Sequence, residues 1–245
     1  MSVAARRRPL PKLGRLVREI EAAIAGGDRT YQSAVVMRSA DALTRRWSRL
    51  PAEDKAGFDR LLAGLLGQVD EEARITFAER LAPLRRAPRL TTSVLARDAS
   101  IRVAGPLLAR CPSFDEAWLL EIVAACGDAH RCAVARRAGL SASLSDALVG
   151  YGSPAVSTAL LANPEAPISP RSMPVLIRMA MRSEAVALAL GVRDDGAGPD
   201  RARLVDRARE RAHASLVRGD AFDEAAARTL LTDVARAAAT PVPPE

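Results

Sequence analysis

Cysteine and histidine side chains gather between positions 111 and 132, where the chemistry to consider is zinc binding or thiol catalysis. They are Cys111, Cys126, His130 and Cys132. A zinc site needs four ligands that converge at tetrahedral angles, whereas Cys111 ends one expected helix and Cys126 ends the next. His130 and Cys132 share a helix but stand two residues apart, so they point in different directions. We expect His130 in the core or a helix interface, with no metal site and no catalytic cysteine.

Acidic and glycine-rich stretches raise the question of cation or nucleotide binding, and neither has the required pattern. Asp194, Asp195 and Asp200 lie in the sequence GVRDDGAGPD, but no glutamate follows in the register of an EF-hand loop. The glycines at 150–152 and 191–198 do not follow an expected strand, as those of a phosphate-binding loop would. We expect solvated turns in both places and no cofactor.

Arginines at the ends of expected helices and two large aromatic residues form a candidate interaction surface. Arg110, Arg136 and Arg137 lie where a cation favours the helix dipole, so they also suit a purely structural role. Trp118 and Tyr151 lie in expected helices of neighbouring repeats. We expect both rings in the core, and the alternative is exposure in a groove that binds a partner.

The basic excess of the chain lies in its N-terminal part. The net charge is +7; residues 1–90 carry 18 basic and 11 acidic side chains, and residues 91–245 carry 18 of each. Residues 1–18 include Arg6, Arg7 and Arg8 and no acidic residue. This arm contacts phosphates or an acidic partner in one hypothesis, and is a frayed, solvated terminus in the other. In the first case its three arginines belong to the candidate interaction surface.

Composition excludes several classes of protein. With 49% apolar and 27% charged residues, the chain is apolar enough to form a packed core, so its composition is not that of a disordered protein. Aromatic residues make up only 3%, and alanine is abundant, which favours helices over β-sandwiches or barrels. The sequence has no apolar run of about 18 residues and no signal-peptide pattern. Three cysteines without disulfide-like spacing suit a reducing compartment. We expect an all-α, cytoplasmic protein with no membrane contact.

Self-alignment at an offset of 26 residues keeps two adjacent columns apolar through five copies. The first column contains Ala82, Leu108, Val134, Leu160 and Val186, and the second contains the residue before each of them. Mostly apolar columns four and five positions earlier complete the i, i+3, i+4 spacing of one helix face. A pair of helices this short cannot bury both faces without stacked neighbours. The period of about 26 residues therefore predicts an α-solenoid of short HEAT-like helical hairpins.

Helix start signals separate the expected helices. Residues 113–116 form a capping box, in which Ser113 is the expected N-cap and Glu116 reaches back. Further N-cap candidates are serines and aspartates that precede apolar runs, two of them followed by proline: Ser141, Ser153 and Ser169, with Asp70 and Asp98 in earlier copies.

We expect five segments along the chain. The first is a basic arm and helical cap at 1–69, with helices near 10–25, 28–49 and 51–68. The HEAT-like repeat core follows at 70–190, and a loop at 191–200. A C-terminal helical cap of two helices occupies 201–239, and a proline-rich tail occupies 240–245.

Residues of the repeat core resemble those of a known family. The sequence LARDASIRVAGPLLARCP at 95–112 is followed by AVARR at 133–137, LVGYG at 148–152 and LANPEA at 161–166. These segments are similar to an uncharacterised bacterial family catalogued as domain of unknown function 2336 (DUF2336). The resemblance spans about residues 55–195 and implies a HEAT-like or leucine-rich-variant-like helical repeat fold. It implies no activity and no catalytic residue.

The sequence does not assemble an acid, a base and an oxyanion donor, so we expect a non-catalytic scaffold or adaptor that binds another protein. The first alternative is nucleic-acid binding through the arginine arm, with steep salt dependence. The second is a repeat-fold hydrolase or a HEAT-like DNA glycosylase. That enzyme needs a basic groove with stacking aromatic residues, whereas the expected repeats are charge-neutral and poor in aromatic residues.

Overall fold

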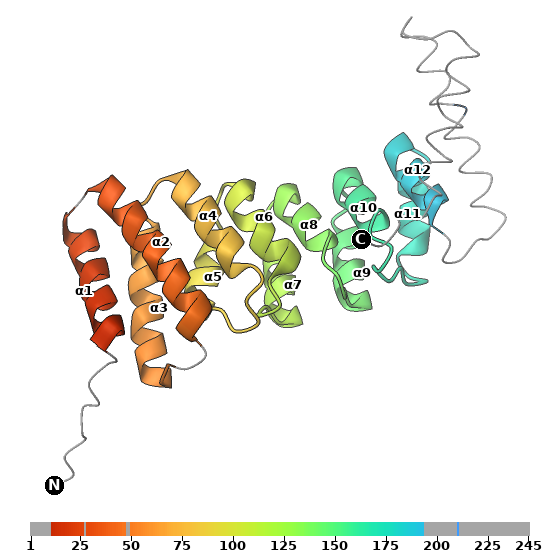
Figure 1. The fold of residues 1–245 in the computed structure, drawn as a ribbon. Coiled ribbons are helices and arrows are strands. Elements are labelled where there is room, and N and C mark those ends of the chain that lie inside the picture. The colour runs from red at the N-terminus through yellow and green to blue at the C-terminus, as the bar shows by residue number, and fades with distance from the viewer. Residues whose placement is uncertain (1–10, 27, 48–49, 194–209, 211–245) are drawn as a thin grey trace, which may run out of the picture. The chain divides into compact units, whose positions relative to one another are not determined.

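The computed structural model describes residues 11–26, 28–47, 50–193 and 210 (Figure 1). Within these ranges the chain forms twelve helices and no strand, which confirms the all-α class. The helices are α1 (Pro11–Gly26), α2 (Arg29–Arg46), α3 (Ala52–Leu66), α4 (Glu71–Leu81), α5 (Arg89–Ala96), α6 (Ile101–Arg110), α7 (Glu116–Ala125), α8 (Asp128–Ala135), α9 (Ala142–Gly150), α10 (Pro154–Leu161), α11 (Met173–Ala180) and α12 (Glu184–Val192).

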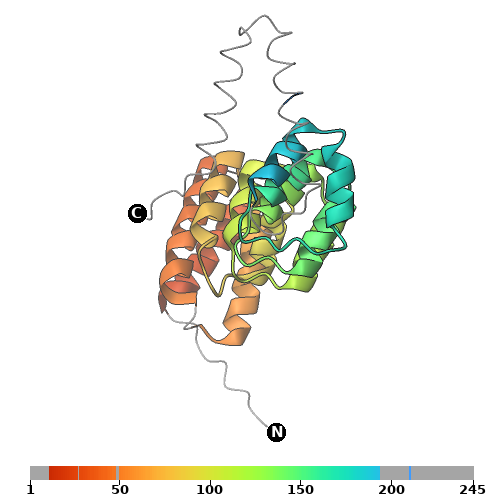
Figure 2. The ribbon, with the colours of Figure 1, turned by 90° about the vertical axis from the view of Figure 1, so that its right-hand side faces the viewer.

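The chain divides into two compact units, Met1–Cys126 and Gly127–Glu245. In the first unit, α2 packs on α4 and α4 on α6, while α1 packs on α3 and α3 on α5. Contacts of α1 with α2, and of α5 with α4 and α6, join these two layers (Figures 1 and 2). Large side chains that are fully buried, among them Ile20, Leu62, Phe77 and Leu107, fill the core. The helices α1 to α4 therefore each pack on the helix two places further along the chain.

The second unit repeats this arrangement. Helix α10 packs against both α8 and α12, and α9 packs against α11. Contacts of α9 with α8 and α10, and of α11 with α12, join the two layers (Figure 2). Fully buried Val134, Leu160 and Val186 lie on α8, α10 and α12, respectively.

The 26-residue period holds in the middle of the repeat region and is wrong at its ends. The helices α4, α6, α8, α10 and α12 follow N-cap residues that are 30, 27, 26 and 30 residues apart: Asp70, Ser100, Gly127, Ser153 and Ser183. All five residues of the first apolar column are buried. However, Ala82 is the C-cap of α4, whereas Val186 lies in the first turn of α12. Longer connections after α4 and α10 shift the register, because an insertion in a loop leaves the helix contacts intact.

Helix caps differ from the predicted ones at three places. Ser100, not Asp98, is the N-cap of α6, and the Asp98 carboxylate accepts from the backbone N–H of Ser100. Asp115, not Ser113, is the N-cap of α7, and its carboxylate accepts from the backbone N–H of Trp118. Helix α11 begins at Met173 after N-cap Ser172, because the Ser169 hydroxyl accepts from the N–H groups of residues 171 and 172 and forms a turn. The predicted side-chain caps are confirmed for α4, α9 and α10: Asp70, Ser141 and Ser153.

Several predicted segments lie outside the described residues. They are the arm with Arg6, Arg7 and Arg8, most of the loop at 191–200, the helical cap at 201–239 apart from Glu210, and the tail at 240–245. Among the helices that the structure describes, none combines the length and the apolar character that crossing a bilayer requires.

Candidate functional site

An elongated groove follows helix α10 in the second unit and encloses about 750 Å³. Ala155 and Ala159 on the outer side of α10, with its C-cap Ala162, form the floor of the groove. Helix α8 contributes Cys132 and its C-cap Arg136, and α12 contributes Ala185. We call this the α10 groove. Small side chains on α10 let neighbouring groups approach its backbone closely, so the groove suits a helix or strand better than a small polar substrate.

The start of α10 is fixed by two local features of the sequence. The Ser153 hydroxyl accepts from the N–H of Val156, and Pro154 occupies the first helical position, where its missing N–H costs nothing. Val156 and Leu160, which are completely buried, anchor the inner side of the helix. As a result the alanines of the opposite side face outward.

Polar side chains that follow α10 and α12 hold the C-terminal ends of these helices in place. The side-chain amide of Asn163 donates to the carbonyl oxygens of Ala135 and Arg137 at 2.9 and 2.7 Å, which joins the ends of α10 and α8. Arg193, which is 8% exposed, donates to the carbonyl oxygens of Asn163 and Ala166 at 2.7 and 2.8 Å. These bonds supply donors to carbonyl groups at the end of α8 and in the turns that follow α8 and α10, where the helical hydrogen-bond pattern has ended.

The environment of the thiol in the α10 groove favours its protonated form. Burial raises the pKa of Cys132 above its ordinary value, although the nearby charge of Arg136 opposes the shift. The thiolate is the nucleophilic form, so a raised pKa keeps this side chain in its less reactive protonated state. Among the residues that the structure describes, no group of three or more His, Cys, Asp or Glu side chains is placed to hold a metal ion.

Trp118 lies in the first unit, in the core as predicted, with 9% of its surface exposed. Its ring stacks on Phe114 at a centroid distance of 4.0 Å, and the guanidinium of Arg97 lies 4.9 Å from its centroid. The exposed part of the ring borders a second recess, of about 430 Å³, between α3 and α5. Arg60 and Leu90 line this recess as well.

The recess owes its shape to a buried carboxylate. Asp59 on α3 accepts from the N–H groups of Leu90 and Thr91 at 2.9 and 2.8 Å, and from the Thr91 hydroxyl at 2.6 Å. It thereby caps the N-terminus of α5 from the neighbouring helix. In the second unit Asp146 on α9 accepts from the hydroxyls of Ser169 and Ser172, just before α11. These two hydroxyls hold the pKa of Asp146 below its ordinary value.

The remaining predicted surface residues have different environments. Arg110 and Arg136 are exposed at the ends of α6 and α8, and Arg137 is half-buried. The prediction of Tyr151 in the core is wrong: its ring is 44% exposed at the C-cap of α9, with the guanidinium of Arg131 3.8 Å from its centroid. The residue ends the helix just before Gly152, whose φ of +68° turns the chain away from the core.

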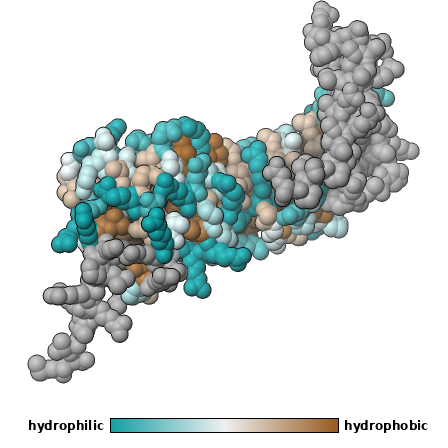
Figure 3. All heavy atoms as spheres, in the orientation of Figure 1, coloured by the Kyte–Doolittle hydropathy of each residue, from teal (hydrophilic) through white to brown (hydrophobic). Residues whose placement is uncertain are grey.

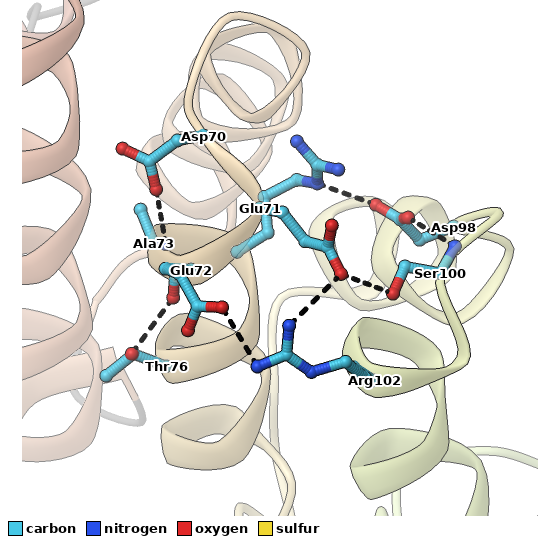
Figure 4. Close-up of polar contacts among 9 residues, drawn as sticks. Asp70, Glu71, Glu72, Ala73, Thr76, Asp98, Ser100 and Arg102 are labelled. Carbon is cyan, nitrogen blue, oxygen red and sulfur yellow. Dashed lines mark hydrogen bonds and ion pairs between the residues drawn. The ribbon is translucent and has the colours of Figure 1, made fainter.

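A network of charged side chains joins the N-terminal ends of α4 and α6 in the first unit (Figure 4). Arg74 pairs with Asp98 at 2.7 Å, and Arg102 pairs with Glu72 at 2.9 Å. Glu71 also accepts from the Ser100 hydroxyl at 2.7 Å. Every acidic group in this network thus pairs with a neighbouring cation, hydroxyl or N–H. We therefore interpret the network as a structural link between the two helices.

Sequence reasoning missed the side chains that join successive helices. In the sequence, Asn163 stands only within the LANPEA segment of the family resemblance, and Arg193 only within the expected loop at 191–200. Both are polar residues within three positions of the end of an apolar helix, and they share this signal with Ser113, whose hydroxyl lies 3.0 Å from the carbonyl oxygen of Leu84. Such a residue is able to reach the end of the preceding repeat, because the two helices end side by side.

Comparison with known families identifies one match. Residues 103–243 match the model of the family described as "Uncharacterised protein conserved in bacteria (DUF2336)". The matched region is more than half of the chain; it begins later than the resemblance over 55–195 implied and takes in the segment at 201–239. No curated protein and no solved structure matches the chain.

Proposed function

The chain belongs to the DUF2336 family of uncharacterised bacterial proteins, and we propose that it is a non-catalytic cytoplasmic scaffold whose helical-repeat surface binds another protein. The α10 groove is the observation that carries this proposal, because it is long, largely apolar and open along one helix. Protein partners bind apolar grooves of this kind through a helix or an extended segment.

The repeat architecture supports the proposal. Within each unit most helices pack on the helix two places further on, such as α4 on α6 and α10 on α12, which is the packing expected of an α-solenoid of HEAT-like hairpins. In the first unit, hydrophilic side chains cover much of the face that α2 and α4 present, and smaller apolar areas lie between them (Figure 3). Stacked hairpins expose more surface for their length than a globular domain, which suits a binding platform.

The chemistry of the groove supports binding rather than catalysis. The raised pKa of Cys132 disfavours a thiolate, and Arg136 and Thr158 are the other side chains of the groove that carry a charge or a hydroxyl. None of these is a general base at neutral pH. An enzyme would need such a base together with a nucleophile and a donor for the developing negative charge.

The proposal is tested by filling the groove without adding charge. Ala155 is exposed on the groove floor, and Ala155→Trp is expected to remove partners that co-purify with the wild-type protein from the native cell. Ala142→Trp, at an exposed alanine of α9 in the same unit, is the matched control and is expected to retain them. Partners that survive Ala155→Trp as well as they survive Ala142→Trp contradict the proposal.

The nucleic-acid alternative is tested in the arm alone. Deletion of residues 1–18 would remove part of α1, including buried Leu16, so substitution of Arg6, Arg7 and Arg8 by Gln is the cleaner change. If the arm binds nucleic acid, the triple variant loses affinity for a DNA duplex and shows a shallower salt dependence than the wild-type protein. If the scaffold proposal is right, co-purification of the protein partner is unchanged.

A further inference from the structure

A second cavity adjoins the α10 groove at the N-terminal end of α10. It encloses about 690 Å³ and has apolar side chains from α11, Val175 and Met179, and the half-exposed Met181 just beyond this helix. We call it the methionine pocket. Pro154, the first residue of α10, lines both cavities, so a bound chain is able to pass from one to the other. Methionine side chains adapt to varied apolar partners and are common on protein-binding surfaces.

Arginines stand at both ends of this continuous surface. Arg178 and Arg182 line the methionine pocket, and Arg136 lines the α10 groove. All three are exposed, and none has an ion-pair partner among the residues that the structure describes. No acidic side chain of that described part lines either cavity. The surface therefore presents positive charge that its own lining does not neutralise.

The distance between the two charged ends follows from the length of α10. Asn163 ties the C-terminal end of α10 to that of α8, so Arg136 lies at this end of the groove, while Arg178 and Arg182 lie at the end marked by Pro154. Helix α10 has 8 residues, which at a rise of 1.5 Å per residue separates the ends by about 12 Å. The floor between them is the alanine face of α10.

We propose that the partner of this surface is an amphipathic helix with acidic residues at both ends of an apolar stripe, about eight residues apart. This inference rests on the proposed scaffold function and adds the chemistry of the partner. A helix fits because the alanines of α10 permit close approach of another helix, while its acidic groups meet the three arginines. The apolar lining of both cavities disfavours nucleic acid, which proteins bind largely through polar contacts to phosphate and sugar.

The test uses a fluorescein-labelled helical peptide of about 16 residues, with a leucine and alanine stripe and a glutamate pair at each end. A second peptide replaces the glutamates with lysines. In fluorescence anisotropy with the full chain, the glutamate peptide is expected to bind at least about tenfold more tightly at low salt, and the difference is expected to narrow at high salt.

The charge is tested by R136E/R178E/R182E, which is expected to abolish or invert the preference for the glutamate peptide. The matched control R85E/R86E/R110E changes three exposed arginines of the first unit by the same total charge, and is expected to keep the preference. Circular dichroism verifies that both variants are folded.

Other outcomes overturn the inference. The inference is wrong if the glutamate peptide does not bind, if both peptides bind equally well, or if R136E/R178E/R182E keeps the preference for the glutamate peptide. It is also wrong if a single-stranded DNA oligonucleotide binds more tightly than the glutamate peptide and R136E/R178E/R182E no longer binds this DNA. The scaffold function fails separately, when Ala155→Trp leaves the co-purified partners in place. If Ala155→Trp loses a co-purified partner that R136E/R178E/R182E still retains, the scaffold function stands and the acidic helix is rejected as the partner.

Discussion

Ion pairs take part in joining successive helices of the same layer in the first unit, whereas the joints described in the second unit are made by side chains that bind backbone carbonyl oxygens, as Ser113 also does in the first. Between α4 and α6 of the first unit, the largely buried ion pair Arg74–Asp98 and the exposed ion pair Arg102–Glu72 make the joint (Figure 4). Between α8, α10 and α12 of the second, Asn163 and Arg193 bind backbone carbonyl oxygens instead. Exposed ion pairs contribute little and weaken with salt, whereas a buried carbonyl that loses its donor carries a full desolvation cost. The stability of the second unit, which contains the α10 groove, thus depends on a few backbone carbonyl oxygens that each accept a hydrogen bond from one side chain.

The largest expected effect is at Arg193. Arg193→Met leaves the carbonyl oxygens of Asn163 and Ala166 without their charged donor, and is expected to lower the free energy of unfolding by about 3 kcal/mol. Hydrogen exchange by mass spectrometry is expected to show faster exchange in α10 and α12. Arg182→Met, at an exposed position, serves as the control. Exchange that accelerates equally in both variants would show that the carbonyl bonds do not stabilise the joint.

A smaller effect is expected at Asn163. Asn163→Ala removes the amide that donates to the carbonyl oxygens of Ala135 and Arg137, with a cost of about 2 kcal/mol from two unsatisfied acceptors. Chemical denaturation followed by circular dichroism measures the loss. Because the bonds join neutral groups, the loss is expected to be the same at low and high salt. A loss that shrinks with added salt would contradict the contrast between the units.

Asp146 makes part of the second unit sensitive to pH. Its folded pKa lies below the ordinary value of 3.8, because the hydroxyls of Ser169 and Ser172 donate to the carboxylate. The stabilisation is therefore complete above that ordinary value and is lost as the pH falls through the lower folded pKa. Asp146→Asn is expected to cost about 1 kcal/mol at neutral pH. The difference from wild type is expected to vanish in acid, as measured by denaturation over a pH series.

The smallest effect is expected in the charged joint of the first unit. Arg102→Gln removes ion pairs to Glu71 and Glu72 on an exposed surface, so the expected loss is below about 1 kcal/mol. That loss is expected to disappear at high salt. Fluorescence of Trp47 and Trp118, which both lie in this unit, reports its unfolding. A loss as large as that of Asn163→Ala would show that the ion pairs stabilise more than their exposure suggests.

Sequence patterns located most helices and several of their caps. Asp70, Ser141 and Ser153 act within their own helices, and a local hydrogen bond of this kind depends only on neighbouring residues. Ser113 has the same sequence pattern, yet its hydroxyl turns to the carbonyl oxygen of Leu84 in the preceding loop, and Asp115 caps the helix. The sequence thus does not predict which residue caps a helix when a group from another part of the fold forms a hydrogen bond with the candidate side chain.

The candidate site was only partly predictable, since a groove depends on which helices lie next to each other. Arg136 was singled out for its position at a helix end, but its place beside Ala155 and Ala159 depends on the packing of α8 on α10. For Tyr151 the prediction from sequence was wrong. Its apolar ring predicted burial, whereas the chain turns at Gly152 and leaves the ring at the surface against Arg131.

By itself the amino-acid sequence determined that the protein is built of short helices with one buried face, because apolar spacing and capping are properties of neighbouring residues. It also located the family resemblance, since the repeat motifs are contiguous. Only the tertiary structure decided that Asn163 and Arg193 bind distant carbonyl oxygens, and that three arginines flank one apolar surface. Those relations join residues about 25 or more positions apart, and they arise from helix packing that no local pattern specifies.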